Sequence, residues 1–354
     1  MSLRKKFKQL MTIATALAAT MTFSSCDQVL DNGYGECTVN YYIDFCYDYN
    51  VMEVDAFHKQ VKSVAVYAFD KDGKLAHIKT DAGNQLTADD YKLHVGKGEL
   101  GSTKATEGFN PADYQLVAWC GLTEDATFTL PKTTIGETTI EELKCKMERS
   151  ATNEVGKLTP LYHGMALYPA VTNVEDNLNP TVMIPLIKNT NNIVLVLQNQ
   201  GGEEMRADMF EFSITDKNGL MAYDNKILTD DELSYKPYST AQGSVDMTKA
   251  TRASSDKANI VRAEFSFGRM MIDHDARLTV KNKLTGTEVF SIPLIDYVLL
   301  VKSNYKSHWG DQEFLDRQDE YNMTFFLDNN LRWLNAEIII NSYRVVLNDV
   351  GLQG

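Results

Sequence analysis

Apolar and polar residues alternate with a period of two through most of this chain of 354 residues, and this period is typical of β-strands with one buried face. The clearest early run, residues 37–49, is rich in Tyr, Val, Ile and Phe, which favour strands. Similar runs follow at residues 61–69, 115–119, 181–188, 192–198, 261–267, 277–281, 288–295, 321–327, 336–341 and 343–347. The pattern predicts an all-β protein of antiparallel sheets, with short helices only near residues 139–149 and 312–320.

One sequence phrase occurs twice, 146 residues apart. Asp70-Lys71-Asp72-Gly73 and Asp216-Lys217-Asn218-Gly219 each separate two strand-like runs. Asp and Gly in this arrangement favour a hairpin turn, because Gly adopts a positive φ at no steric cost. The first phrase lacks the further acidic residues and the closing Glu of a calcium loop, so we interpret it as a turn. The domain-sized interval predicts two related β domains.

The first 26 residues have the order of a bacterial lipoprotein signal. Four basic residues between positions 4 and 8 precede 14 residues without a charge, and Ser24-Ser25-Cys26 follows. The uncharged stretch is shorter than the roughly 20 residues that span a bilayer, so it indicates a cleaved export signal. Its end resembles the lipobox at which signal peptidase II cuts before a diacylglyceryl-modified cysteine. Cys26 is therefore the predicted lipidation site and the predicted mature N-terminus.

Acylation at Cys26 predicts permanent membrane attachment, because a single acyl chain binds a membrane only reversibly and two or three chains make release negligible. We expect a signal peptide at residues 1–25, a polar tether at 26–36, an N-terminal β-sandwich at 37–175 and a C-terminal β-sandwich at 176–354. The size of the chain agrees with two domains, and Asn, Asp and two prolines around residues 170–180 mark the boundary. The apolar run at residues 292–301 carries Asp296 and is interpreted as a buried strand.

The mature chain is strongly acidic. The whole sequence has a formal net charge of −13, and residues 1–25 hold four of the 35 basic residues and no acidic residue, so their removal gives −13 − 4 = −17. Binding to a nucleic-acid backbone requires a basic patch. We therefore exclude nucleic acid as a partner.

No residue pattern indicates a metal or a cofactor. Cys37, Cys46, Cys120 and Cys145 contain no C-x-x-C spacing, and the six histidines have no metal-binding spacing. The expected oxidising compartment allows one or two disulfides among the four cysteines, and the three complete pairings stay open. We expect neither a bound metal nor a cofactor.

Catalytic signatures are also absent from the sequence, which has no nucleophile elbow, phosphate loop or dinucleotide fingerprint. Asp316 and Glu320 lie four residues apart, as a carboxylate pair on one helical face would, but a solvated, internally paired face is the preferred interpretation. Asp48, Asp55 and His58 match no established ligand spacing. The sequence predicts that the protein is not an enzyme.

Aromatic residues leave two interpretations open. Tyr41, Tyr42, Phe45, Tyr47 and Tyr49 crowd one predicted strand. If exposed, such rings stack on sugars, whereas a β-sandwich core uses the same residues at alternate positions. Core packing is preferred, and glycan binding is the alternative function.

Six phrases together resemble the FimB/Mfa-type fimbrial anchor lipoproteins of Bacteroidetes. They are FCYDYN at 45–50, DAFHKQVKSV at 55–64, VYAFDKDG at 66–73, YQLVAW at 114–119, LYHG at 161–164 and LDRQDEYNMTFFL at 315–327. The phrases occur in family order over nearly the whole mature chain. The closing strand pair differs from the family pattern at Ser342 and Tyr343, where Gly and Trp are usual.

This resemblance implies two transthyretin-like β-sandwiches and a lipid anchor at Cys26. It also implies a lipoprotein of the outer membrane, at the cell surface, that anchors a fimbrium and helps to assemble it. Its expected partners are the lipid bilayer and fimbrial shaft subunits, bound by strand exchange or by docking to an open sheet edge. The alternative is a surface lipoprotein that binds glycans.

Overall fold

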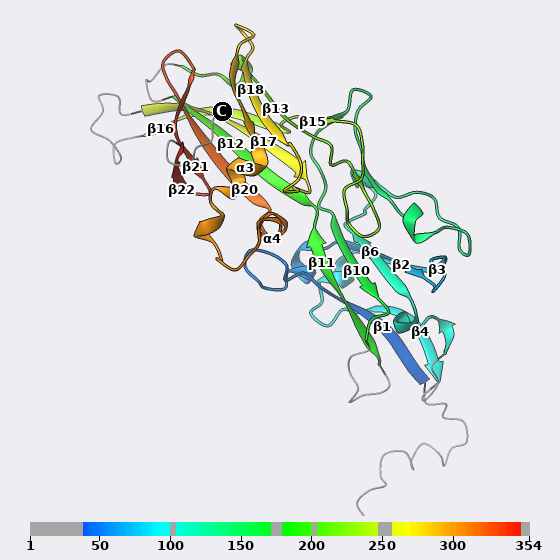
Figure 1. Ribbon diagram of the computed structural model, residues 1–354. Helices are drawn as coiled ribbons and strands as arrows, with labels where there is room; N and C mark the ends of the chain where they lie inside the picture. The colour runs from blue at the N-terminus through cyan, green and yellow to red at the C-terminus, as the bar shows by residue number, and fades with distance from the viewer. Residues whose placement is uncertain (1–37, 100–103, 171–178, 200–203, 247–256, 348–354) are drawn as a thin grey trace, which may run out of the picture.

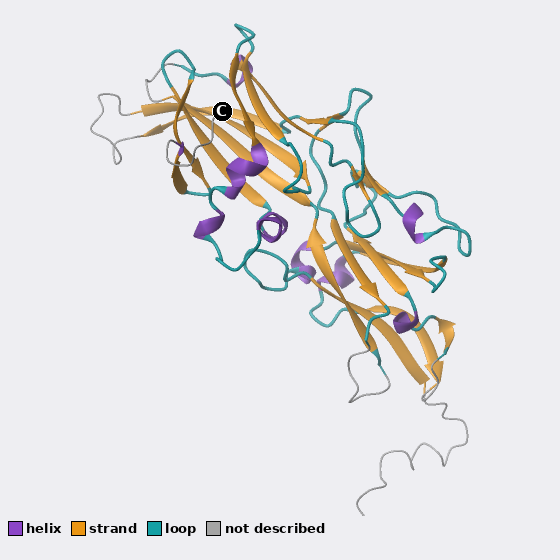
Figure 2. Cartoon of the chain, viewed as in Figure 1, coloured by secondary structure: helices purple, strands orange, loops and turns teal. Residues whose placement is uncertain are grey.

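The computed structural model describes residues 38–99, 104–170, 179–199, 204–246 and 257–347. Strands dominate the described part of the chain, so the all-β prediction is confirmed. Figure 1 shows an elongated molecule in which strands of the N-terminal half lie at one end and strands of the C-terminal half at the other. Figure 2 shows the helices as short, isolated turns between the strands.

An eight-stranded sheet forms the N-terminal half. The first described strand, β1, lies inside this sheet, and its residues alternate between buried and more accessible positions as the sequence pattern predicts. In sheet order the strands are β3 (Leu75–Ala82), β2 (Ser63–Phe69), β6 (Gln115–Cys120), β10 (Tyr162–Leu167), β11 (Thr181–Lys188), β1 (Thr38–Cys46), β4 (Leu93–Glu99) and β5 (Ala105–Gly108).

Two larger sheets and one small sheet complete the fold. The six-stranded sheet has the order β16 (Ser239–Asp246), β17 (Lys257–Gly268), β12 (Thr190–Asn199), β20 (Glu320–Leu327), β21 (Trp333–Ile340) and β22 (Tyr343–Val346). The five-stranded sheet has the order β19 (Glu288–Pro293), β18 (Arg277–Asn282), β13 (Phe210–Asp216), β15 (Leu233–Tyr235) and β9 (Glu154–Val155). The small sheet consists of β14 (Leu220–Met221), β8 (Cys145–Met147) and β7 (Phe128–Thr129).

Most strand pairs are antiparallel, but three are parallel, which the sequence did not predict. These pairs are β1 with β11, β12 with β20 and β15 with β9. Parallel neighbours need a long connection between them, and more than 100 residues separate the strands of the first two pairs. The period of two identifies a strand but not its partner, so pairing between such distant segments is invisible to it.

The two D-K-[DN]-G phrases adopt different structures. Asp70-Lys71-Asp72-Gly73 closes the hairpin of β2 and β3, and Gly73 has a φ of 71°, so the predicted turn is confirmed. The second phrase closes no hairpin between its flanking strands, because β14 pairs with β8 instead of β13. Gly219 is required there for close packing, since an added Cβ would lie 2.7 Å from Arg149, Asp230 and Leu233 atoms.

The helices of the described ranges are α2 (Phe57–Gln60), α3 (Leu294–Leu299) and α4 (Asp311–Arg317), with 3-10 turns η2 (Asn84–Thr87), η3 (Pro111–Asp113), η4 (Ile140–Glu142), η5 (Ala207–Met209) and η6 (Lys302–Asn304). The strand predicted at residues 292–301 is wrong beyond Pro293, where α3 begins. Pro293 still pairs with Arg277, and the Leu294 amide donates to the Ala276 carbonyl at 2.7 Å, so the ladder ends where α3 begins. The helix is apolar on several sides because Leu294, Ile295, Tyr297 and Val298 are all buried.

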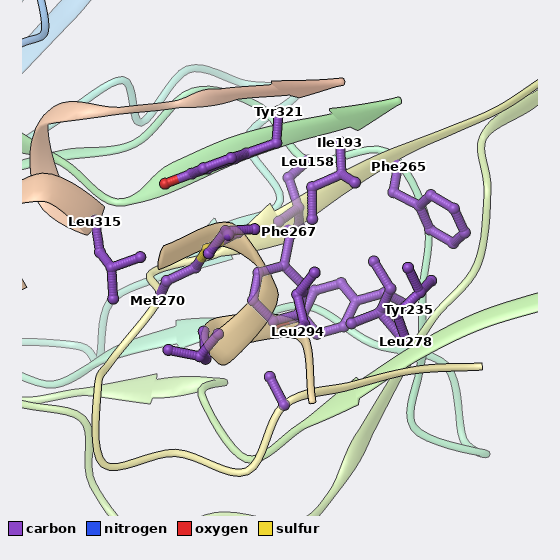
Figure 3. Close-up of a cluster of buried hydrophobic side chains, with 14 of the residues drawn as sticks. Leu158, Ile193, Tyr235, Phe265, Phe267, Met270, Leu278, Leu294, Leu315 and Tyr321 are labelled. Carbon is purple, nitrogen blue, oxygen red and sulfur yellow. The ribbon is translucent and has the colours of Figure 1, made fainter. Parts of the chain in front are cut away.

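Two hydrophobic cores stabilise the fold. The smaller core lies on one face of the N-terminal sheet and includes Ile43, Val182 and Ile184. The larger core joins both halves of the chain, because Trp119 and Leu158 belong to the same cluster as residues of the C-terminal sheets. Figure 3 shows Leu158 among Ile193, Phe265, Phe267 and Leu294.

The connection between β6 and β10 also links the two halves of the chain. It contains β7, β8 and β9, and it pairs with the C-terminal strands β14 and β15. Residues before the boundary predicted near residue 175 thus complete sheets formed by residues after it. The boundary itself stays a prediction.

Candidate functional site

The predicted lipidation site, Cys26, lies outside the described residues, as do the signal at 1–25, the tether at 26–36 and Cys37. The structure therefore leaves the role of Cys26 as a prediction. Among the residues that the structure describes, no helix is long and apolar enough to cross a membrane.

Three cysteines lie within the described residues, and all three are free thiols: Cys46, Cys120 and Cys145. Burial raises the pKa of the Cys120 thiol to about 12 and that of the Cys46 thiol to about 11. Burial also raises the pKa of the Cys145 thiol. Their thiolate forms are disfavoured, so these cysteines are not activated nucleophiles.

The two carboxylates that the sequence places four residues apart, Asp316 and Glu320, do not form a pair in the structure. Asp316 lies in α4 and is paired with Arg269, whereas Glu320 begins the next strand and accepts a hydrogen bond from Asn192 at 2.8 Å. Their spacing of four residues therefore does not place them on one helical face, because α4 ends at Arg317.

Asp55 and His58 also have structural roles. One Asp55 oxygen accepts hydrogen bonds from the Tyr47 and Phe57 amides at 2.9 and 3.0 Å, and His58 Nδ1 lies 3.0 Å from the Leu86 carbonyl oxygen. In the described ranges no group of three or more His, Cys, Asp or Glu residues could hold a metal ion.

The crowded aromatic strand is mostly a core strand. Tyr41, Phe45 and Tyr47 are buried, and Tyr49 lies under the Arg317 guanidinium, whose carbon is 3.9 Å from the ring centroid. The more exposed tyrosines lie apart in the sequence: Tyr168 follows β10, Tyr238 precedes β16 and Tyr343 begins β22. The described residues do not form the planar aromatic row that stacking on a glycan needs.

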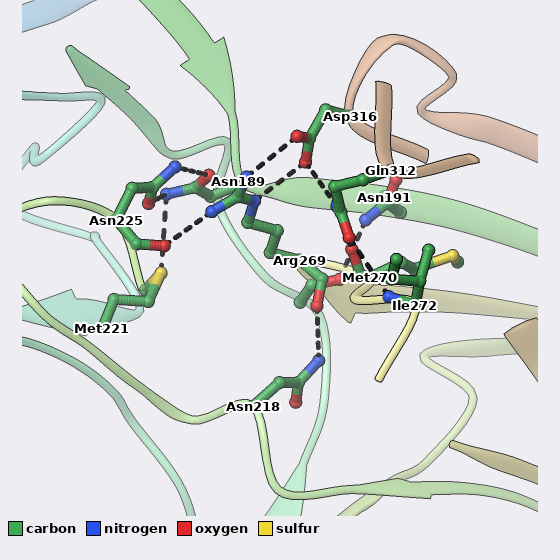
Figure 4. A network of polar contacts seen from close by, with 11 residues as sticks. Asn189, Asn191, Asn218, Met221, Asn225, Arg269, Met270, Ile272, Gln312 and Asp316 are labelled. Atoms are coloured by element: carbon green, nitrogen blue, oxygen red, sulfur yellow. Dashed lines mark hydrogen bonds and ion pairs between the residues drawn. The ribbon is translucent and has the colours of Figure 1, made fainter. Parts of the chain in front are cut away.

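A buried polar network holds the two halves together (Figure 4). It starts at Asn189, the single residue between β11 and β12, which is fully buried. The Asn189 side chain donates to Asn225 Oδ1 at 2.6 Å and accepts from Asn225 Nδ2 at 3.0 Å, and its backbone amide donates to the Leu161 carbonyl at 2.8 Å. These bonds join the N-terminal sheet to a loop of the C-terminal half.

Arg269 extends this network into α4. Its guanidinium donates to the Asn225 carbonyl at 2.6 Å and to both carboxylate oxygens of Asp316 at 2.8 Å each. Side-chain exposure is only 12% for Arg269 and 6% for Asp316, so water screens the pair weakly. Gln312 also donates to Asp316, at 3.1 Å. Two parallel bonds to one carboxylate fix the orientation of both groups.

His163 forms a second bridge between the halves. It lies on β10, and its Nε2–H donates to the Tyr223 carbonyl oxygen at 2.7 Å, while its ring contacts Trp119 edge-on. Burial, the main cause, lowers the pKa of His163 to about 4, so the ring is neutral at physiological pH.

The C-terminal half contains an open strand edge beside a groove. Strand β13 pairs with β18 from Phe210 onward, but with β15 only over its last three residues, Ile214–Asp216. Residues 210–213 therefore have no described strand partner on that side. The Lys283 amide donates to the Met209 carbonyl, so by alternation the backbone groups of Phe210 and Phe212 face the open side.

The groove along this edge has a volume of about 650 Å³. Phe210 and Phe212 line it from β13, and Thr240 and Gln242 line it from β16, the edge strand of the six-stranded sheet. At its rim the Lys236 ammonium lies 3.7 Å from Glu154 and 3.6 Å from Glu211. This groove can accept an extended chain that pairs with β13, the mode called β-augmentation. No sequence signal indicated it, because it results from a missing strand partner.

The chain is similar to known fimbrial proteins. A family model described as fimbrillin-A associated anchor proteins Mfa1 and Mfa2 matches residues 34–349. The minor fimbrium anchoring subunit Mfa2 of Porphyromonas gingivalis is 23% identical over 306 residues, which are 84% of each chain.

Two solved structures extend this comparison. A candidate polysaccharide-binding protein from Bacteroides thetaiotaomicron is 28% identical, with a TM-score of 0.71 over 89% of this chain and 100% of that chain. The fimbrial anchor protein Mfa2 from Porphyromonas gingivalis is 17% identical, with a TM-score of 0.60 over 88% of this chain and 100% of that chain. The fold predicted from the sequence agrees with these matches.

The buried pair predicts a large stability loss on Asp316→Asn. The substitution leaves the Arg269 guanidinium buried without its carboxylate, which typically costs about 3–5 kcal/mol. Urea unfolding followed by circular dichroism measures this change. Asp208→Asn is the matched control, since Asp208 pairs with Arg206 at the surface and its loss is expected to cost under about 1 kcal/mol. Equally small losses of unfolding free energy in both variants would contradict the role of the Arg269–Asp316 pair in holding the two halves together.

His163 predicts a pH-dependent loss of stability. Its folded pKa of about 4 lies below the unfolded value of about 6.5, so the unfolded chain takes up this proton first as the pH falls. Stability therefore decreases between pH 6.5 and 4, by about 3 kcal/mol for this residue. In His163→Gln the free energy of unfolding should depend less on pH over this range. His308→Gln, at an exposed position, should keep the original slope, and an unchanged slope in His163→Gln would refute the assignment.

Proposed function

This chain belongs to the family of fimbrillin-A associated anchor proteins Mfa1 and Mfa2, and on that premise we propose that it anchors a fimbrium at the outer membrane and helps to assemble it. The observation that carries the proposal is the extent of the family match, residues 34–349, which includes every described strand. The family is one of structural anchor proteins, and we infer that this member is likewise structural and not an enzyme.

We further propose that Cys26 attaches the protein to lipid. The basic start, the short uncharged stretch and the Ser24-Ser25-Cys26 exit support this proposal. Acyl chains on Cys26 place the mature N-terminus at the bilayer, close in sequence to Thr38, where β1 begins. The proposed location is the outer membrane, on the cell-surface side.

The groove beside β13 is the proposed docking site for a shaft subunit. Its open backbone groups suit an extended segment whose alternate side chains face Phe210 and Phe212. Figure 1 places β13 and β16 at the end of the molecule opposite β1 and β4. A shaft docked there points away from the lipid attachment.

Glycan binding remains the second candidate function. A similar solved structure is described as a candidate polysaccharide-binding protein, which favours it. Tyr168 lies after β10, Tyr238 before β16 and Tyr343 in β22, and this separation argues against a stacking platform, so anchoring is the preferred function.

Loss of the anchor predicts detached fimbriae. Deletion of the chain in its native host should leave fimbriae of altered length that are released into the medium, and the wild-type chain should restore attachment. A Cys26→Ala chain should leave the membrane fraction and fail to restore it, whereas Gln28→Ala, in the proposed tether after the cut, should behave as wild type. Electron microscopy and fractionation measure these outcomes. Normal attached fibres in the deletion strain would defeat the anchor function, and membrane retention of Cys26→Ala would defeat lipidation.

If a shaft subunit docks in the groove, substitutions on the groove-facing side of β16 should weaken its binding, and substitutions on the opposite side should not. Thr240→Trp places a bulky ring in the groove, so affinity for the host's shaft subunit should fall at least about tenfold, or about 1.4 kcal/mol. Ala241→Trp, on the opposite face of the same strand, should leave affinity unchanged, because neighbouring strand residues point to opposite faces. Both positions are exposed, so both variants should fold. Equal affinities in a binding titration would place the docking site elsewhere.

A further inference from the structure

The outer face of the N-terminal sheet carries an uncovered apolar patch. In β11, Val182, Ile184 and Leu186 face the smaller core, so Met183 and Pro185 between them face outward. Met183 is 43% exposed, and Leu167, at the end of the neighbouring strand β10, is 54% exposed.

Strand β1 continues this patch on the other side of β11. Met183 lies beside Asp44, and Thr181 lies beside Tyr42, whose ring contacts the exposed His94 of β4 edge-on. Tyr168, 48% exposed, follows Leu167 and accepts a hydrogen bond from Gln115 at 3.5 Å. We define the outer-face patch as Tyr42, Leu167, Tyr168, Met183 and Pro185.

The patch is almost free of charge in a strongly acidic protein. None of its five residues is charged, but Asp44 lies beside Met183 on the same face, and its carboxylate lies 4.0 Å from the Lys92 ammonium. A contiguous apolar area of this kind on one sheet face is the usual sign of a contact surface. Its composition of Tyr, Leu, Met and Pro suits an apolar partner with a polar boundary, since Tyr prefers membrane–water interfaces.

The position of the N-terminus indicates which apolar partner covers the patch, because the proposed lipid attachment lies nearby. Eleven residues lie between Cys26 and Thr38, so the distance between these two residues is at most about 40 Å for a fully extended chain and about 20 Å for a flexible coil. Tyr42 follows Thr38 by four residues in the same strand, a distance of about 13 Å. A bilayer attached at Cys26 is therefore within reach of the whole patch, and this argument rests on the lipid attachment proposed above.

We propose that the outer-face patch rests on the lipid surface at the level of the headgroups. Lipid attachment and this contact together orient the molecule, so that the outer face of the N-terminal sheet lies against the bilayer. The contact is apolar, so added salt leaves it unchanged, unlike a contact that depends on basic residues.

Tryptophan probes on the acylated full-length protein test this contact. The protein is purified from membranes and inserted into vesicles of phosphatidylethanolamine and phosphatidylglycerol, with and without bromine on the acyl chains, which quenches nearby tryptophan. Tyr168→Trp should lose roughly half of its added emission, because side chains at an interface lie about 5–10 Å into the headgroup and acyl boundary. Leu284→Trp is the control, since Leu284 is 69% exposed in the turn between β18 and β19 and should lose none.

A second tryptophan variant keeps the test valid if the Tyr168→Trp protein does not fold. Met183→Trp, on the neighbouring strand, should be quenched as well, and emission of the unsubstituted protein is subtracted in each case. Protein that floats with the vesicles but shows no quenching at either position overturns the membrane contact and leaves the anchor function intact. Protein that fails to float defeats lipid attachment, and the contact falls with it. Quenching equal to that of Leu284→Trp, or a stable dimer of the protein that hides both probes from the lipid, also overturns the proposal.

Discussion

The ion pair between Arg269 and Asp316 is the constraint on which the arrangement of the molecule depends. A guanidinium this deeply buried must be paired, because an unpaired charge in the interior is far more costly than the pair itself. Arg269 meets that requirement with groups from α4 and from the loop at Asn225, and its own carbonyl accepts from Asn218. The loop in turn holds Asn189, the residue at which the chain passes from one sheet to the other. An arrangement of the halves that breaks these contacts leaves buried polar groups unpaired, which is costly.

The chain also joins its two halves by strand pairing, because a segment of the N-terminal half adds strands to sheets of the C-terminal half. The connection between β6 and β10 supplies β8 and β9 to sheets of the C-terminal half, and its apolar residues extend one core through both halves. A linker between independent domains would leave their relative orientation free. Here the backbone ladder, the larger core and the buried network all oppose a hinge at Asn189.

The sequence predicts the local features of this fold well and the distant ones poorly. The period of two locates most of the long strands, because one buried face is enough to produce it, but the predicted strands do not include β4, β10 and β16. It does not detect α3, since a helix buried on several sides has no polar stripe. The second D-K-N-G phrase looks like a turn by composition, yet Asn218 is buried and bonded to the Arg269 carbonyl. The groove beside β13 depends on where β15 ends, and no local signal records that. Cys26 lies outside the described residues, so its prediction still rests on the signal sequence alone.

The parallel pairing of β1 with β11 has a mechanical consequence. With the proposed lipid attachment at Cys26, a fimbrium pulled by flow applies tension between the N-terminus and the far sheets, so the load enters at the start of β1. It leaves through the end of β11, which continues into β12 after Asn189. Parallel strands pulled at these opposite ends are loaded in shear, so the five register pairs from Tyr42 to Cys46 share the force together. A hairpin pulled apart at its open end would instead lose its hydrogen bonds one after another.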